Sequence, residues 1–593
     1  VEQRTRGFPG HPVFPQYYFP FTAHDKGHTW VKIMVNWKSK KLGDLLILAN
    51  GIMLIILVNV LGQQFFFRLD LTEEKRFSIK PQTKEILAGL EDKVYIEVYL
   101  EGDLNPGFKR FSKAIRETLD EFRVYSNDRV SFVFVDPAKA KSQKARNEFM
   151  AELAAKGIQP TNVIDNQNGQ RIEKLIFPGA LVTYSAAETG VMLLKGNKAG
   201  SPEEEINQSI EGIEFEFANA IRKLSDEERK TVGIVLGHGE LDSVQAAGVF
   251  ESLSEIYSVL PVDLSRDYLP DLDALVIARP TRLFSASERF SLDQYLMQGG
   301  KVLMMLDKLS ASMDSASTDS YFAFPVNTGL DDQLFRYGVR INPDLIMDQQ
   351  AGFFPVVTGQ SGSTPRIQLL EWPFFPLIHQ YADHPVTRNL DAVLLRFASS
   401  MDTVKAPGIK KTPLLFTSPF TRRMSSPVNV NINQFRNVDQ GRFTEGRIAV
   451  ACLLEGKFTS AFRNRILPEE ADHEKFISEG APAKLIVVSD GDLARSEINP
   501  RSGKAFPLGF DPYTKYTYAN QELVLNMLSF LIDDNGLILA RNKEIMFRPL
   551  DRSRIADEKT KWQIINLGVP VILVLIFGVV KAFFRKRKYS KFL

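Results

Sequence analysis

The stretch Thr231-Val-Gly-Ile-Val-Leu-Gly-His-Gly-Glu240 decides the fold of the larger part of this chain. Its run 232–236 is continuously apolar, which is the pattern of a strand buried on both faces of a parallel sheet. A turn with two glycines follows directly, and residues 244–256 then have the pattern of a helix. Strand, tight turn and helix in this order predict the first unit of a doubly wound α/β fold.

Further units of the same kind follow downstream, and together they predict a doubly wound α/β domain over residues 229–545. Ser285 is suited to cap one of its helices, and Gly299-Gly300 to end it. The predicted elements are, in chain order, the strand 275–278, the helix 287–297, the strands 302–306, 448–454 and 485–488, and the helix 520–532.

A large insertion, about residues 310–447, interrupts this domain, and we expect it to be irregular. Gly352-Phe-Phe-Pro355 and Trp372-Pro-Phe-Phe-Pro376 place aromatic residues beside prolines. These aromatic side chains either pack the insertion against the edge of the sheet or form a rigid surface that recognises a partner or a glycan. We expect the first arrangement.

A smaller α/β domain is predicted upstream, over residues 70–228. The alternation of strand, helix, strand, hairpin and helix favours a thioredoxin-like or similar plan, without the redox cysteines. Its function would then be docking. The expected elements are the strand 94–100, the helix 108–125, the strand 130–135, a hairpin region within 175–194 and the helix 205–224.

Two uncharged apolar stretches, 45–67 and 562–580, bracket these domains. Each has the length of about 20 residues that a helix needs to cross a bilayer, and we expect one membrane helix at each end of the chain. A cleaved signal peptide is the alternative for the first stretch. The expected boundaries are an N-terminal cytoplasmic segment 1–41, a membrane helix 42–67, a linker 546–561, a second membrane helix 562–582 and a basic cytoplasmic tail 583–593.

The charges beside the second helix predict the orientation. Six basic residues follow it, and the positive-inside rule places such a tail in the cytoplasm. Two spans put both termini on that side of the inner membrane and the main body outside, in the periplasm of a Gram-negative cell. The six are Lys581, Arg585, Lys586, Arg587, Lys588 and Lys591.

Composition excludes several classes of protein. The 593 residues are 44% hydrophobic and 24% charged with a formal charge of +2, so the body is an ordinary globular protein with no electrostatic footprint for nucleic acid. The only cysteine, Cys452, lies in an apolar run and can form no intrachain disulfide. We interpret it as a core residue.

Candidate site residues follow the predicted strands. In doubly wound folds ligands bind beyond the carboxyl ends of the strands, so we expect any ligand to contact the polar residues there. His238 and Glu240 would form an acid–base pair or part of a metal site, or else the glycines only permit a tight turn and the histidine caps the backbone. The residues are Gly237, His238, Gly239, Glu240, Asp307, Asp490 and Asp492.

No familiar catalytic motif accompanies these residues. The sequence lacks a phosphate-binding P-loop, a Gly-x-Ser-x-Gly nucleophile elbow, a His-Glu-x-x-His motif and a Cys/His zinc spacing. We therefore expect no enzymatic activity, no cofactor and no bound metal. A membrane-anchored body without an ATPase motif of its own implies partner subunits that supply the energy.

Five segments are distinctive: Leu69-Asp-Leu-Thr-Glu-Glu-Lys-Arg-Phe-Ser78, Glu97-Val-Tyr-Leu-Glu-Gly-Asp-Leu104, Ala114-Ile-Arg-Glu-Thr-Leu-Asp-Glu-Phe122, Gly237-His-Gly-Glu240 and the helix that begins at Trp562. They resemble the gliding-motility-associated ABC transporter auxiliary protein GldG of Bacteroidota, in order over residues 40–593. The resemblance implies a complex with a separate ATPase and a multispanning permease. The Gly-His-Gly-Glu domain is also similar to one in intraflagellar-transport proteins and to class I glutamine amidotransferases without the catalytic cysteine, which implies a binding module.

Two alternatives to a transporter subunit stay open. An extracytoplasmic hydrolase or amidotransferase-like enzyme would depend on His238 or Glu240, whereas a structural anchor would bind a glycan or an envelope protein without any transporter. Residues 1–33 depart from the family pattern, and Met34 resembles a natural start. We expect residues 1–33 to be a non-native extension.

Overall fold

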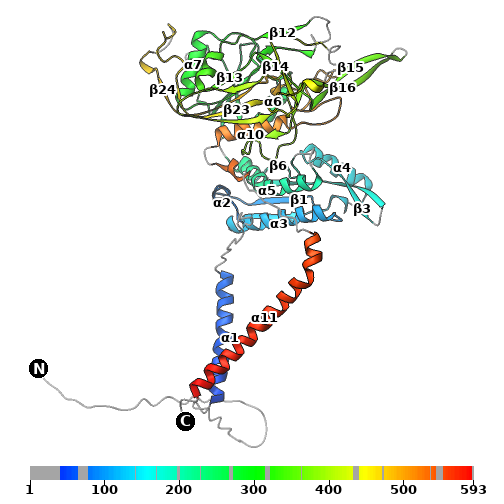
Figure 1. Ribbon diagram of the computed structural model, residues 1–593, viewed down its shortest axis with the longest axis vertical. Helices are drawn as coiled ribbons and strands as arrows, with labels where there is room; N and C mark the ends of the chain where they lie inside the picture. Colours follow the sequence, from blue (N-terminus) through cyan, green and yellow to red (C-terminus); the bar gives the residue numbers. More distant parts are fainter. Residues whose placement is uncertain are drawn as a thin grey trace, which may run out of the picture. The chain divides into compact units, whose positions relative to one another are not determined.

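The computed structural model of the chain contains two compact units, Val1–Leu69 and Asp70–Leu593. The described part of the first unit is the helix α1 (Lys40–Gln64), and Figure 1 shows the order of the elements along the chain. Residues 1–33, which we expect to be a non-native extension before a start at Met34, lie outside the described residues. The structure describes residues 40–64, 78–139, 142–167, 170–196, 201–226, 229–265, 271–313, 321–361, 364–431, 440–469, 473–533, 536–541 and 552–589.

Residues 78–226, here named the small sheet region, form a four-stranded sheet in the order β2-β1-β5-β6. β1 and β2 run parallel, while β5 runs antiparallel to β1. The predicted alternation of strands, hairpin and helices is observed, and the thioredoxin-like plan stays a prediction. The elements are α2 (Pro81–Ala88), β1 (Val94–Val98), α3 (Pro106–Tyr125), β2 (Val130–Phe134), α4 (Gln143–Ala155), β3 (Thr161–Gln167), β4 (Gln170–Ile176), β5 (Gly179–Tyr184), β6 (Ala187–Met192) and α5 (Pro202–Ser225).

Local capping explains where the long helices of this region begin. The Asn105 side chain accepts a hydrogen bond from the Phe108 backbone, which starts α3. Ser201 and Glu204 form a reciprocal capping box, so α5 begins three residues before the predicted position 205.

Residues 229–533, here named the large sheet region, are built around an eight-stranded sheet in the order β17-β20-β23-β24-β10-β9-β7-β8. β8, β7, β9, β10 and β24 are parallel, in the chain order 2-1-3-4-5 of a doubly wound sheet. The order reverses between β7 and β9. The strands are β7 (Thr231–Val235), β8 (Ser258–Val262), β9 (Ala274–Ala278), β10 (Lys301–Met305), β17 (Gln380–Tyr381), β20 (Ile409–Phe416), β23 (Ala449–Thr459) and β24 (Glu479–Val488).

Helices cover both faces of this sheet, as the uninterrupted apolar strands predict. Alternate strand residues divide between two cores: Ile234 packs in the core that contains α6 and α10, while Val235 packs in the core that contains α7 and α9. α6 begins three residues after the predicted position 244, because Asp242 first turns the chain by accepting two backbone hydrogen bonds. The helices are α6 (Ala247–Ser254), α7 (Ala286–Met297), α9 (Asp331–Tyr337) and α10 (Asn520–Ile532).

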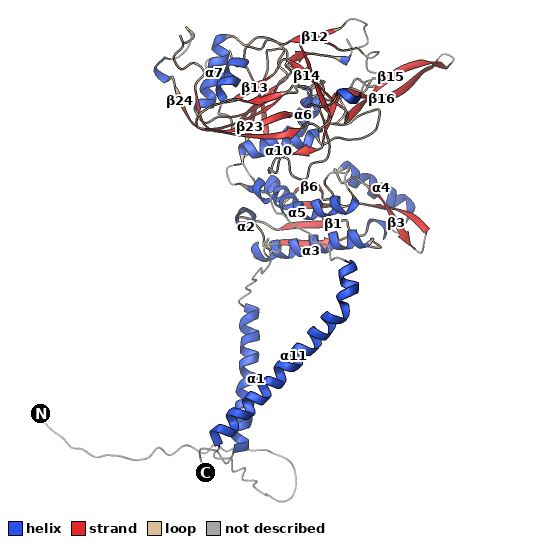
Figure 2. Cartoon of the chain, viewed as in Figure 1, coloured by secondary structure: helices blue, strands red, loops and turns tan. Residues whose placement is uncertain are grey.

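The expectation that the insertion is irregular is wrong, because it contributes many short strands and extends the large sheet with β17 and β20. Trp372, Phe374 and Phe375 are buried in a core built mostly from insertion residues, separate from the two cores of the large sheet, while Phe353 is exposed. The three buried aromatic side chains thus pack within the insertion, and the expected packing against the sheet edge is not observed. A long hairpin, β15 (Ala351–Ser361) and β16 (Thr364–Ile378), extends from it (Figure 2). The remaining strands are β11 (Leu309–Ser310), β12 (Phe322–Pro325), β13 (Val339–Ile341), β14 (Asp344–Asp348), β18 (Val393–Leu394), β19 (Met401–Thr403), β21 (Thr421–Ser425) and β22 (Val428–Asn429).

Among the described residues, one helix is long and apolar enough to cross a membrane: the stretch Asp557–Phe584 within α11 (Arg552–Tyr589). The predicted linker 546–561 is therefore wrong over 552–561, which are helical and continuous with the apolar stretch, and residues 546–551 lie outside the described residues. In α1 the described apolar stretch is Leu45–Val60. Residues 65–67 of the predicted first membrane helix also lie outside the described part.

Candidate functional site

The seven predicted site residues lie at the carboxyl edge of the parallel strands. The segment from Gly237 to Glu240 follows β7, Asp307 follows β10, and Asp490 and Asp492 follow β24. β9 lies between β7 and β10, and Arg279, which follows it, was missed by the sequence reasoning because no motif marks it. The polar residues form two groups, one around His238 and one around Arg279.

The turn after β7 is shaped by its two glycines. Gly237 and Gly239 have φ values of 120° and 73°, which side-chain-bearing residues rarely adopt. A Cβ on Gly239 would also lie 2.3 Å from the Thr281 hydroxyl oxygen. The Glu240 carboxylate closes the turn by accepting hydrogen bonds from the backbone nitrogens of Gly237 and His238, at 3.0 and 2.7 Å. The sequence therefore needs glycine at both positions for this turn.

The His238 ring is buried, with 4% of the residue exposed, and is surrounded on three sides. It stacks on Phe284 with ring centroids 3.7 Å apart. Its Nδ1 lies 3.3 Å from Glu240 Oε1, and its Nε2 lies 3.1 Å from Glu288 Oε1. His238 therefore lies between the carboxylates of Glu240 and Glu288, and Glu288 was missed. His238 Nδ1 and Glu240 Oε1 form no hydrogen bond, so the acid–base pair stays a prediction.

Glu288 has a structural role of its own as well. Its other carboxylate oxygen accepts a hydrogen bond from the backbone of Ser285 at 2.7 Å, which completes the capping box of α7. Burial would raise the pKa of Glu288, but the hydrogen bonds from Ser285 and His238 outweigh it, so its pKa lies below the usual range. The group therefore joins the turn after β7 to the start of α7.

The second group joins three aspartates to two arginines. Arg279 Nε lies 2.9 Å from Asp307 Oδ2 and 3.1 Å from Asp492 Oδ1. Asp490 accepts a hydrogen bond from the Arg396 backbone at 2.6 Å and one from the Asp492 backbone at 2.8 Å. The predicted aspartates are thus brought together, but they contact one another and the arginines rather than the His238 group.

Burial is the largest influence on the pKa values of Asp307 and Asp490. Burial, and then the charge of Asp492, raise the pKa of Asp307 to about 6. Burial, and then the charge of Asp307, raise the pKa of Asp490 well above its usual value. For Arg279, burial and the neighbouring charges act in opposite directions. Burial would lower its pKa, but the negative charges of Asp492 and Asp307 raise it above the ordinary range. The cluster is tightly paired inside the protein.

Arg279 occupies a strained position at the turn from β9 toward α7. Its φ is 57°, which is rare for a residue with a side chain, and a Cβ on Gly491 would lie 2.7 Å from its Cβ. Residues 279–285 separate the end of β9 from the start of α7, so this connection is a loop and not the sharp elbow that exposes the nucleophile of α/β hydrolases. Cys452 lies instead within β23, where burial raises its thiol pKa to about 12, as the structural interpretation expects.

A small apolar cavity of about 20 Å³ lies under the turn after β7, which is room for about one water molecule. Glu240 lines it together with side chains of β7, β9, β10 and α6. Among the described residues no group of three or more His, Cys, Asp or Glu side chains is arranged to hold a metal ion.

Comparison with known proteins places this site in a family. The family described as "ABC-type uncharacterized transport system" matches residues 229–527, half of the chain. The chain belongs to this family. A second family, a domain of unknown function, matches residues 73–183. The transport-family match starts just before β7 and ends within α10, so both polar groups lie inside it.

Two individual proteins are also similar. An uncharacterized protein of Borreliella burgdorferi strain B31 is 21% identical over 577 residues, which cover 92% of this chain and 99% of that protein. Among solved structures, the N-terminal domain of mmIFT52 covers 51% of this chain and 97% of its own, at 13% identity and a TM-score of 0.29. A score of this size supports no inference.

Proposed function

We propose that the chain is a non-catalytic, membrane-anchored auxiliary subunit of an ABC transporter complex. Its body binds a substrate or an envelope partner outside the cytoplasmic membrane, and separate permease and ATPase subunits supply the transport path and the energy. The observation that carries this proposal is the match to the transport-system family over residues 229–527.

The site geometry supports a binding role over catalysis. His238 lies between Glu240 and Glu288, and Arg279 is held between Asp307 and Asp492. A general base or nucleophile has to reach a substrate within hydrogen-bonding distance, whereas these groups are buried and paired. A ligand at the carboxyl edge would contact the accessible members of the seven, such as the exposed Gly237, while buried members such as Asp490 would shape the edge.

The topology follows from the helix ends. The stretch Asp557–Phe584 spans the inner membrane, and the basic residues after it stay in the cytoplasm. With α1 as a second span, both termini are cytoplasmic and the body is periplasmic. A reporter fused after Leu593 should then be active only in the cytoplasm, and one inserted at Ser361 only outside. The reverse pattern would refute the orientation.

The partnership is tested by purification of the tagged full chain in mild detergent. We expect a permease and an ATPase to copurify, with ATP hydrolysis residing in the partner. The variant Asn59→Leu changes an amide of α1 that is costly against lipid, so it should reduce recovery of the partners without preventing insertion. His238→Ala, which lies in the body, is the matched control and should leave recovery unchanged.

Two outcomes would favour the alternatives. Correctly inserted protein that never associates with an ATPase-bearing complex would favour an envelope anchor. Amide or ester hydrolysis by the purified chain that disappears in His238→Ala would favour an enzyme. The association with gliding motility, and with Bacteroidota, rests on the resemblance to GldG, and it adds the expectation that deletion of the gene abolishes surface motility.

A further inference from the structure

The short helix η6 (Leu537–Arg541) is the last described segment before the chain continues to α11. We name it the C-terminal strap. Although it lies close to a membrane helix in sequence, it is almost fully buried: Leu537 is 1% and Arg541 is 1% exposed. The strap contacts α5 and α2 of the small sheet region and α10 of the large sheet region.

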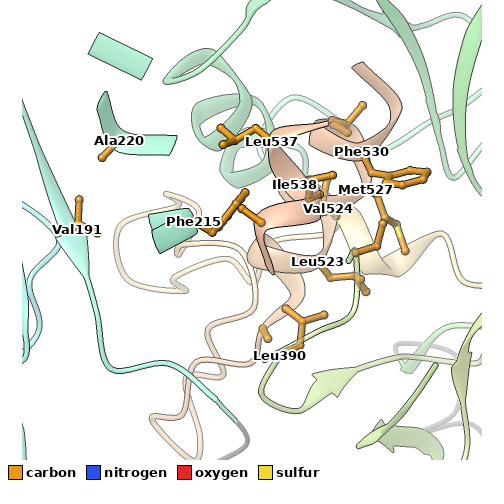
Figure 3. Packing of buried hydrophobic residues seen from close by; sticks show 14 of the residues in the cluster. Val191, Phe215, Ala220, Leu390, Leu523, Val524, Met527, Phe530, Leu537 and Ile538 are labelled. Atoms are coloured by element: carbon orange, nitrogen blue, oxygen red, sulfur yellow. The ribbon is translucent and has the colours of Figure 1, made fainter. Parts of the chain in front are cut away.

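An apolar core continues through the junction between the two regions. Leu537 and Ile538 of the strap belong to the same cluster of buried side chains as Phe215 of α5 and Leu523 of α10. Figure 3 shows the side chains of Phe215, Leu523, Leu537 and Ile538 near one another in this cluster. The strap therefore fills the space where the two regions meet.

Four charged side chains, one buried and three half-buried, cross this junction. Arg541 donates a hydrogen bond to Glu522 of α10 at 3.1 Å and lies 4.9 Å from the centre of the Phe215 ring. Lys195, in the loop after β6, lies 3.3 Å from the same Glu522 oxygen and 3.0 Å from Glu216 of α5. The two cations and two anions thus link the strap, the large sheet region and the small sheet region in one network.

The network holds its charges despite burial. Burial would raise the pKa of Glu522, but Lys195 and Arg541 outweigh it and lower the pKa. Burial would lower the pKa of Lys195, but Glu216 and Glu522 raise it instead. Removing one partner from such a network leaves an uncompensated buried charge, which is strongly unfavourable.

A second contact fixes the start of the strap. The Ile538 backbone donates a hydrogen bond to Asp533 Oδ2 at 2.8 Å, and Arg222 of α5 lies 3.7 Å from the other oxygen of the same carboxylate. The only other chain connection between the two regions is the segment 226–230. Without the strap contacts, the regions would be joined by that segment and by a few polar contacts. These include the Asn389 amide, which donates to the Gln208 carbonyl at 3.0 Å, and Lys195, which lies 3.3 Å from Glu522.

We propose that the C-terminal strap is a latch, which holds the small and large sheet regions together at their junction, so that its release loosens α5 as well as the strap itself. The proposal does not depend on a transporter partner, because it concerns contacts within this chain.

Hydrogen exchange measured by mass spectrometry on the full chain in detergent tests the latch. In the wild type, we expect the strap amides to exchange as slowly as those of α10. In Arg541→Met the strap should exchange about 100-fold faster, because Glu522 loses a buried partner, and the facing amides of α5 should exchange faster as well. Arg463→Met is the matched control, since Arg463 pairs with Glu479 at the surface with 44% of its side chain exposed.

Two results would overturn the latch. One is rapid exchange of the strap in the wild type. The other is a strap that opens in Arg541→Met while α5 and α10 keep their wild-type rates. If Arg541→Met does not fold, Ile538→Val removes one buried methylene and should accelerate exchange at the strap and the facing part of α5 together, by about 2- to 10-fold. Acceleration confined to the strap would again contradict the proposal.

Discussion

The substitution Asp307→Asn tests the charge cluster at the carboxyl edge of the large sheet. Asp307 accepts hydrogen bonds from the Gly491 backbone at 2.6 Å and from Arg279 Nε at 2.9 Å. Asparagine has nearly the same shape but does not titrate. The variant therefore removes the pH dependence that this carboxylate gives to the free energy of unfolding, whatever constant offset its altered hydrogen bonds add.

The magnitude follows from the raised pKa. A change from 3.8 to about 6 in the folded protein corresponds to about 3 kcal/mol. The side chain is 10% exposed, so solvent screening reduces this little. Because the folded-state pKa is raised, the stabilising contribution is complete below the unfolded-state pKa and is lost as the pH rises through about 6. Relative to the wild type, Asp307→Asn should gain about 2–3 kcal/mol between about pH 4 and pH 7.5.

Urea unfolding of the detergent-solubilised chain at a series of pH values measures this difference. Trp372 is buried and is the only tryptophan between residues 78 and 541, so its fluorescence reports on the body. Asp331→Asn is the matched control, because the Asp331 side chain is 57% exposed. A difference between Asp307→Asn and the wild type that stays constant over this pH range would refute the cluster as described.

Two further substitutions or treatments test the packing. Gly491→Ala places a methyl group 2.7 Å from the Arg279 Cβ and should lower the free energy of unfolding by about 1–3 kcal/mol; an unchanged urea midpoint would contradict the close approach. Cys452 is 1% exposed with a thiol pKa of about 12, so a thiol reagent should label it only after unfolding; rapid labelling of the folded chain would show that β23 is not buried.

The doubly wound region could be predicted from the sequence because its strands are buried on both faces. Such strands are continuously apolar, and the residues 232–236 show this without ambiguity. The helix 520–532 was predicted with the bounds that the structure gives to α10. The strands of the insertion could not be predicted from the sequence. Strands β11 to β22 are mostly short and many pair with strands far away in sequence, so neither their length nor their hydrophobic periodicity marks them.

The candidate site was predictable only in part. His238, Asp307 and Asp490 were found because the rule for parallel sheets points to the residues after each strand. Arg279 and Glu288 were missed, although capping by Glu288 three residues after Ser285 was a signal in the sequence. The distribution of these side chains into two separate groups depends on strand order, which the sequence does not contain.

By itself, the sequence determined the apolar helices at the ends, the alternation of strands and helices, and the polar residues at strand ends, because each depends on residues close together in the chain. Tertiary structure decided the rest. The pairing of Arg279 with Asp307 and Asp492, the insertion of β20 beside β23, and the burial of Arg541 between α5 and α10 all join segments far apart in sequence. Such contacts form only when the whole chain packs, because the free energy that holds a buried charge comes from partners supplied by other elements.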